Sequence, residues 1–118
     1  MNVNQEIMGL KSVTGLTVSQ DIYSGKDESF ITFTYNTEDP VFWGDDQVIE
    51  DEAVIQVNLY TPPAFNYMEL KTKIRDYLET LGIVDSIGSW LDTYTFKNNL
   101  EKTIRHTTFI VTITKERI

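Results

Sequence analysis

A chain of 118 residues with 41% hydrophobic and 24% charged residues has the composition of one soluble globular domain. A formal net charge of −8, with ten Lys and Arg residues that form no basic cluster, argues against nucleic-acid binding driven by phosphate neutralisation. The absence of cysteine excludes disulfides, thiol nucleophiles and cysteine-ligated zinc. We also find no apolar run near the ~18 residues of a membrane span and no N-terminal secretory signal, and the lack of cysteine fits assembly in a reducing cytoplasm.

The first third of the sequence predicts a short helix and then a strand. A helix over residues 2–11 would carry its apolar residues on one side, and Gly9 and Gly15 indicate that it ends early. That apolar side consists of Val3, Ile7, Met8 and Leu10. Residues 16–23 (LTVSQDIY) are typical of a strand, and residues 24–29 (SGKDES) predict a polar turn.

Two further strands flank an acidic stretch. Residues 30–35 (FITFTY) are β-branched and aromatic, which favours a strand. Residues 53–60 (AVIQVNLY) predict another strand, whose apolar side consists of Ala53, Ile55, Val57 and Leu59. Because its other side carries Gln56 and Asn58, we expect the sheet to be covered on one side only.

The clearest helix pattern lies between Asn66 and Gly82. Pro62-Pro63 ends the preceding strand, because proline cannot donate a ladder hydrogen bond. Asn66 with Glu69 indicates a capping box, and Gly82 occupies the position of a helix C′ glycine. The apolar residues between them recur at helical spacing and form one stripe: Tyr67, Leu70, Ile74, Tyr77, Leu78 and Leu81. We expect this stripe to cover a sheet.

Two strands end the chain. Residues 89–96 (SWLDTYTF) alternate in polarity, a polar connection follows, and residues 103–116 (TIRHTTFIVTITKE) predict a long strand with one half-polar face. One face of the first of these strands would carry Trp90, Asp92, Tyr94 and Phe96. We therefore predict a single α+β domain over residues 1–118, with a mixed or antiparallel sheet of about five strands packed against two helices and an acidic loop at about 36–52.

The acidic stretch TEDPVFWGDDQVIEDE (residues 37–52) contains seven carboxylates. Its spacing does not match a calcium loop, since Gly44 precedes Asp45 and Asp46, and Val48 stands where a ligand is needed. A catalytic carboxylate pair needs a desolvated member with a raised pKa, which so charged a stretch does not favour. We expect a solvated loop with no metal and keep a small-ligand or cation-binding module as the alternative.

His106 is the only histidine and lies beside Arg105 in a predicted strand. Gly88-Ser89-Trp90 lacks the strand–turn–helix context of a nucleophile elbow, and the six glycines form no phosphate-binding loop. We interpret His106 as a structural or surface residue, and we expect no catalytic residue and no cofactor.

Phe42 and Trp43 lie among the carboxylates, and two roles would account for aromatic residues at these positions. Large aromatic side chains in a charged segment either fold back onto the core or anchor a partner. We hypothesise that residues 37–52 form a mobile arm in the free subunit, ordered on assembly against a partner surface that carries Lys or Arg. The expected interface residues are Phe42, Trp43, Asp45, Asp46 and Glu50.

The order of segments along most of the chain resembles a known family. The acidic stretch leads into IQVNLYT, a Pro/Asn turn and NYMELKTKIRDYLETLGI, followed by WLDTYTF, a polar Glu/Lys connection and RHTTFIVTI. This order is similar to that of small phage and prophage tail components that include tail terminators, also called tail completion or tail-to-head joining proteins of long-tailed phages. The resemblance covers roughly residues 28 to 114 and contains no catalytic signature.

The resemblance implies a structural protein and not an enzyme. Members of such families form a ring, usually a hexamer, on the end of the tail tube, where the ring halts tube polymerisation and presents a surface to the head connector or neck protein. It implies a place in the tail or neck of the virion, after assembly in the bacterial host cytoplasm. DNA would pass through the ring without specific binding, and no membrane is involved. Another phage neck or head-completion protein is the alternative within this class.

Overall fold

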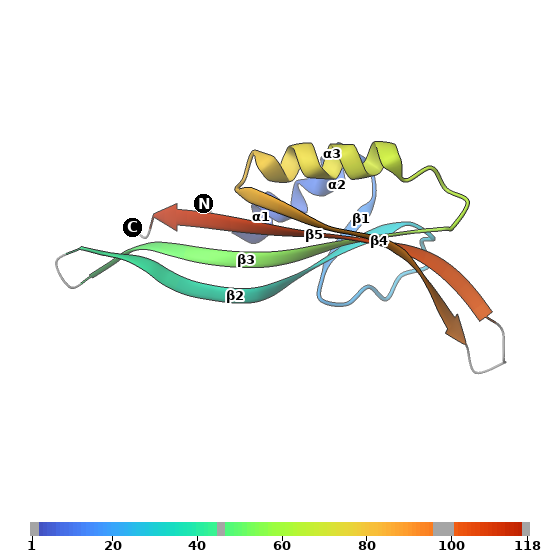
Figure 1. Cartoon of the computed structure of the whole chain (residues 1–118), viewed down its shortest axis with the longest axis horizontal. Helices are drawn as coiled ribbons and strands as arrows, with labels where there is room; N and C mark the ends of the chain where they lie inside the picture. Colours follow the sequence, from blue (N-terminus) through green and yellow to red (C-terminus); the bar gives the residue numbers. More distant parts are fainter. Residues whose placement is uncertain (1–2, 45–46, 96–100, 117–118) are drawn as a thin grey trace.

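The computed structural model describes residues 3–44, 47–95 and 101–116. It contains one five-stranded sheet with helices on one face (Figure 1). The elements in chain order are α1 (Val3–Met8), α2 (Leu10–Thr14), β1 (Thr17–Gln20), β2 (Phe30–Gly44), β3 (Gln47–Thr61), α3 (Met68–Glu79), β4 (Ile83–Thr95) and β5 (Glu101–Glu116). The predicted single α+β domain with a mixed sheet of about five strands is confirmed.

The sheet has the strand order β1-β2-β3-β5-β4. β1 pairs with β2 in parallel, and every other neighbouring pair is antiparallel. The short β1 and the long β4 are therefore the two outer strands. Because β1 pairs only with the first four residues of β2, the remainder of β2 is an edge of the sheet as well.

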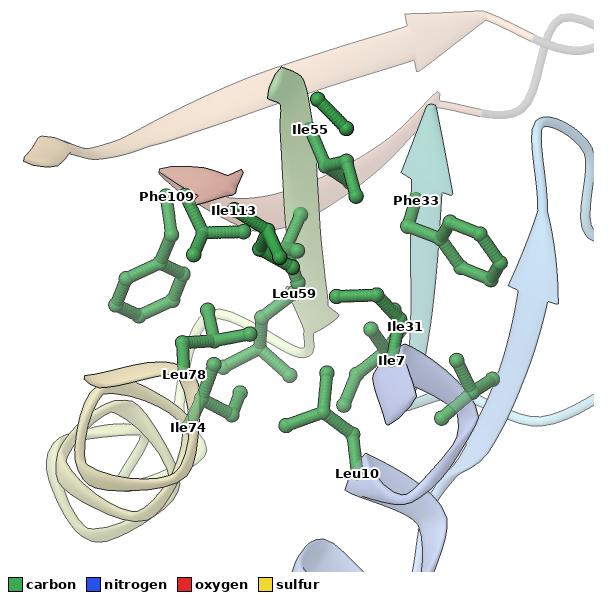
Figure 2. Close-up of a cluster of buried hydrophobic side chains, with 14 of the residues drawn as sticks. Ile7, Leu10, Ile31, Phe33, Ile55, Leu59, Ile74, Leu78, Phe109 and Ile113 are labelled. Carbon is green, nitrogen blue, oxygen red and sulfur yellow. The ribbon is translucent and has the colours of Figure 1, made fainter. Parts of the chain in front are cut away.

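The hydrophobic core lies between the helices and one face of the sheet (Figure 2). Ile7 and Leu10 enter it from the N-terminal helices, while Ile74 and Leu78 enter it from α3. The sheet contributes Val18, Ile31, Phe33, Ala53, Ile55, Val57, Leu59, Phe109, Val111 and Ile113. The apolar stripe predicted for α3 faces the sheet as expected, since three of its members, Leu70, Ile74 and Leu78, are buried.

The N-terminal helical segment reaches further than residues 2–11 and is divided at Gly9. It ends at Thr14, where Gly15 adopts a left-handed conformation with φ of 74°. Gly9 is required by packing, because a Cβ there would lie 2.1 Å from the Tyr77 hydroxyl oxygen. That hydroxyl donates to the Glu6 carbonyl oxygen at 2.5 Å and so ties the N-terminal segment to α3.

The ends of α3 differ from the predicted capping pattern. The Asn66 side-chain oxygen does accept the Met68 backbone N–H at 3.3 Å, but Glu69 forms an ion pair with Lys73 at 3.3 Å. Gly82 is not a left-handed cap; a Cβ there would lie 2.1 Å from the Thr112 carbonyl oxygen. The glycine thus allows the chain to pass close to β5 as β4 begins.

The expectation of an acidic loop at about 36–52 is wrong. On either side of residues 45–46 this segment is strand, paired between β2 and β3 from Thr37↔Val54 to Gly44↔Gln47. Val41, Phe42 and Trp43 in β2, and Val48 and Ile49 in β3, are residue types that favour strands. We call residues 36–52 the acidic arm.

Pro40 is compatible with this pairing because β2 is an edge strand at that point. The register shifts twice next to it, between Pro40 and Phe42 and between Phe42 and Trp43. Such bulges, together with proline and charge, discourage unwanted edge-to-edge pairing. The β2 edge of the arm therefore disfavours nonspecific backbone pairing with other strands.

Candidate interaction surfaces

The acidic arm carries the residues expected at a subunit interface. The backbone of Phe42 pairs with Glu50, and that of Trp43 pairs with Val48, near the end of the hairpin. Figure 1 shows this end of β2 and β3 projecting beyond the helices. The other two expected residues, Asp45 and Asp46, lie outside the described residues.

A second feature, a row of five rings, crosses the face of the sheet opposite the helices. The ring centroids of Tyr23 and Phe30 lie 4.1 Å apart, and those of Phe30 and Tyr60 lie 4.9 Å apart. His106 continues the row at 4.5 Å from Tyr60, and Trp90 ends it at 4.6 Å from His106. We call this row the ring row.

The strand register produces the ring row. Phe30 pairs with Tyr60, Tyr60 pairs with His106, and His106 pairs with Trp90. Directly paired residues point to the same face, and neighbouring strands are ~4.8 Å apart, which matches the stacking distance of aromatic rings. Most ring faces are therefore covered by neighbouring rings, so the row stiffens this face and does not offer a flat platform to a ligand.

Polar side chains hold His106 in the ring row. Its Nε2 lies 2.8 Å from Asn58 Oδ1, which also accepts from the Thr108 hydroxyl at 3.0 Å and from the Gln56 amide at 3.0 Å. We assign the proton of the neutral ring to Nε2, where it is donated to Asn58. Asp92 lies 3.4 Å from His106 Nδ1 and accepts from the Trp90 indole N–H at 3.0 Å.

Burial lowers the pKa of His106 below its ordinary value of 6.5, because the partly desolvated site disfavours the charged ring. The Asp92 carboxylate opposes this shift, since it would stabilise a proton on Nδ1. The imidazole is consequently neutral near pH 7. The polar neighbours of the ring are Asn58, Thr108 and Asp92, and the Thr108 hydroxyl donates to Asn58, which agrees with the interpretation of His106 as a structural residue.

The described residues do not bring together a metal site. No group of three or more His, Asp or Glu side chains able to hold a metal ion is found among them. Asp45 and Asp46 lie outside the described residues, so the expectation of no metal stays a prediction. A calorimetric titration with calcium should show no transition tighter than about millimolar, because paired strands do not wrap around a cation as a calcium loop does.

Sequence reasoning missed the ring row, although it placed all five of its members in predicted strands. Phe30 shares its predicted face with Thr32 and Thr34, and Tyr60 shares its face with Gln56 and Asn58, so an aromatic residue on a polar face was a usable signal. The row also depends on which strands are neighbours and in which register, and neither follows from periodicity within one strand.

Comparisons with known proteins do not assign the chain to a family. No family model and no curated protein matches the chain. Among solved structures 25 chains match; one of these is 9% identical over 92% of this chain and 92% of its own, with a TM-score of 0.47. Such a similarity is too weak to support a functional statement. No helix in the described part of the chain is long and apolar enough to cross a membrane.

Proposed function

We propose that this protein is a tail terminator of a long-tailed phage or prophage: a structural virion protein that forms a ring at the end of the tail tube, stops tube polymerisation and joins the tail to the head connector. The proposal starts from the resemblance over roughly residues 28 to 114. It makes the protein a non-enzymatic component of the tail or neck, assembled in the bacterial host cytoplasm and requiring no cofactor.

The observation that best supports this proposal is the elongated shape. The Cα radius of gyration is 16.3 Å, and the principal extents are 59 × 29 × 22 Å. A compact domain of this length has a radius of gyration of about 13.5 Å. The excess arises from hairpins that extend past the helix-covered body (Figure 1), and projecting hairpins suit contacts with neighbouring subunits better than enclosure of a small molecule.

A ring also requires two different surfaces on each subunit. A head-to-tail contact, in which one surface binds a different surface of the next copy, closes into a ring when the rotation between copies permits it. The acidic arm at one end of the molecule provides one such surface. In this proposal Phe42 and Trp43 bury against the neighbouring subunit or the tail tube protein, and Asp45, Asp46 and Glu50 select a basic partner surface.

The charge of the chain is compatible with a channel for DNA. Eighteen acidic residues against ten basic ones repel the phosphate backbone, so DNA would pass through the ring without specific binding. The proposed partners are therefore other copies of the chain, the tail tube protein and the head connector or neck protein.

Two measurements test this function. Native mass spectrometry and negative-stain microscopy of the concentrated protein should show a closed ring, most simply a hexamer. Deletion of the gene from its phage or prophage should give overlong tails without heads, and the wild-type gene supplied in trans should restore tail length. A protein that stays monomeric, together with tails of normal length after deletion, would refute the proposal. Headless tails of normal length would instead favour a head-completion role.

A further inference from the structure

The end of the molecule opposite the acidic arm carries a patch of large side chains around Arg105. The Arg105 guanidinium carbon lies 4.6 Å from the centroid of the Tyr67 ring, and Leu91 is paired with Arg105 in the sheet. Phe65 and Met68 flank Tyr67 along the chain. The exposed fractions of Phe65, Met68 and Leu91 are 44%, 54% and 51%. We call these five residues the Arg105 patch.

The composition of the Arg105 patch is that of a protein interface. Aromatic residues, methionine and arginine are enriched where proteins bind one another, and residues of these types supply most of the binding energy. The Tyr67 ring holds the Arg105 guanidinium in place before any partner arrives, which lowers the entropy lost on binding.

Arg105 also lacks a polar partner within the described part of the chain. No carboxylate there forms an ion pair with it, and its Nε is buried without a hydrogen-bond acceptor. The hydroxyl of the fully buried Thr61, directly paired with Arg105 in the sheet, likewise has no partner. In a chain with a net charge of −8, an arginine without an ion-pair partner among the described residues offers a binding position to an acidic group of a second molecule.

We infer that the Arg105 patch receives the acidic arm of a second copy of this chain. The arm offers seven carboxylates between residues 37 and 52 together with Phe42 and Trp43, and the patch offers a positioned arginine among exposed apolar side chains. The two surfaces are therefore complementary in both charge and polarity. This inference rests on the proposed ring and specifies the contact that closes it.

The arm of one molecule cannot reach the patch of the same molecule. Thr61, at the patch, and Gln47, at the tip of the arm, are the two ends of β3, roughly 46 Å apart at the rise of an extended strand. Figure 1 shows the arm and the start of α3 at opposite ends of the sheet. The contact is therefore between different surfaces of successive copies, as a ring requires.

Mixing two defective variants tests the contact directly. The patch variant Leu91→Asp places a like charge in front of an incoming acidic arm, and the arm variant Phe42→Ala/Trp43→Ala removes the apolar anchors. Each variant alone should be monomeric at concentrations where the wild type assembles. In a 1:1 mixture only one productive contact exists, between the intact arm of the patch variant and the intact patch of the arm variant. Native mass spectrometry should therefore show a 1:1 dimer that grows no further.

A matched pair of arginine variants isolates the role of Arg105. Arg105→Gln and Arg75→Gln remove the same charge, but Arg75 lies on α3 outside the patch. Arg105→Gln should lose assembly, whereas Arg75→Gln should retain it. Circular dichroism and thermal melts establish that each variant is folded; if Arg105→Gln does not fold, the exposed Leu91→Asp decides the outcome.

The possible results separate the inference from the proposed function. If the wild type forms a ring and the patch variants form it equally well, the patch is not the receptor, although the ring stands. A mixture that gives no dimer, or that forms complete rings, likewise overturns the inference. If the wild type is monomeric at every concentration, both the ring and this contact are wrong.

Discussion

The two faces of the sheet are stabilised in different ways. One face packs against three helices through aliphatic side chains, and fifteen buried hydrophobic residues form a single core there. In the described part of the chain no helix covers the opposite face, which carries the ring row; Asn58 and Thr108 are hydrogen-bonded next to its member His106. Burial of apolar area supports the first face, whereas stacking and hydrogen bonding support the second.

This difference has a consequence for how the protein tolerates change. Hydrophobic burial contributes roughly 25 cal/mol per Å² removed from water, so deletions on the covered face are costly. Ring pairs and neutral hydrogen bonds contribute about 1 kcal/mol each, so the open face can vary with little loss of stability. Single changes at exposed positions of this face should therefore cost less than truncations in the core.

The largest predicted effect comes from truncating Ile74 on the covered face. Ile74 is fully buried between α3 and the sheet, so Ile74→Ala should lower the free energy of unfolding by about 2–5 kcal/mol through lost burial and the cavity left behind. Ile110→Ala makes the same truncation at a half-buried site on the open face and should cost less. Urea denaturation measures the loss of unfolding free energy in both variants. Equal losses would show that side chains on the two faces contribute equally to stability.

The next effect concerns an ion pair between a buried carboxylate and a partly exposed lysine, which ties the N-terminal segment to β5. Lys115 Nζ lies 2.7 Å from Glu6 Oε1, and the Glu6 side chain is 6% exposed. Lys115→Met leaves this carboxylate buried without its cation and should cost about 1–3 kcal/mol. Lys73→Met is the control, because its pair with Glu69 is exposed and should contribute no more than about 0.5 kcal/mol. A cost for Lys115→Met no larger than that of the control would contradict this prediction.

The elements of the covered face could be predicted from the sequence because their signals are local. The spacing of Leu70, Ile74 and Leu78, and the alternation of Ala53, Ile55, Val57 and Leu59, each identify a buried side within one segment. Residues 83–88 of β4 were missed because polar residues and Gly88, with φ of 139° at a bulge, interrupt the alternation.

The arm and the ring row required information that a single segment does not contain. The high charge of residues 36–52 suggested a loop. The strand-forming residues on both sides of Gly44 fit a hairpin, but a hairpin is stabilised by the pairing of its two strands and not by either strand alone. The environment of His106 depends on the β3–β5–β4 order, which brings Asn58 from 48 residues away. Long-range register determines the open face, so periodicity alone does not reveal it.

A smaller effect is expected for coupling within the ring row. Phe30 and Tyr60 stack at 4.9 Å on the open face. Phe30→Leu, Tyr60→Leu and the double variant form a double-mutant cycle, in which the coupling energy should be about 0.5–1.5 kcal/mol. Thermal or urea unfolding of the four proteins gives this value, and a coupling energy near zero would mean that the rings are neighbours without stabilising one another.

The smallest predicted effect is a pH dependence that originates at His106. Because its pKa is lower in the folded state than the unfolded value of about 6.5, the unfolded chain binds more protons between those two values. The free energy of unfolding should therefore rise with pH through this window, be fully developed above about pH 6.5, and decline as the pH falls below it. His106→Phe keeps a ring in the row and removes the titrating group, so the difference between its stability profile and that of the wild type isolates the contribution of His106.

As the only histidine in the chain, His106 also gives a single imidazole NMR signal, and the midpoint of its pH titration in the folded protein should lie below 6.5. A midpoint above 6.5 would show that the Asp92 carboxylate outweighs desolvation, and the open face would then gain stability on acidification.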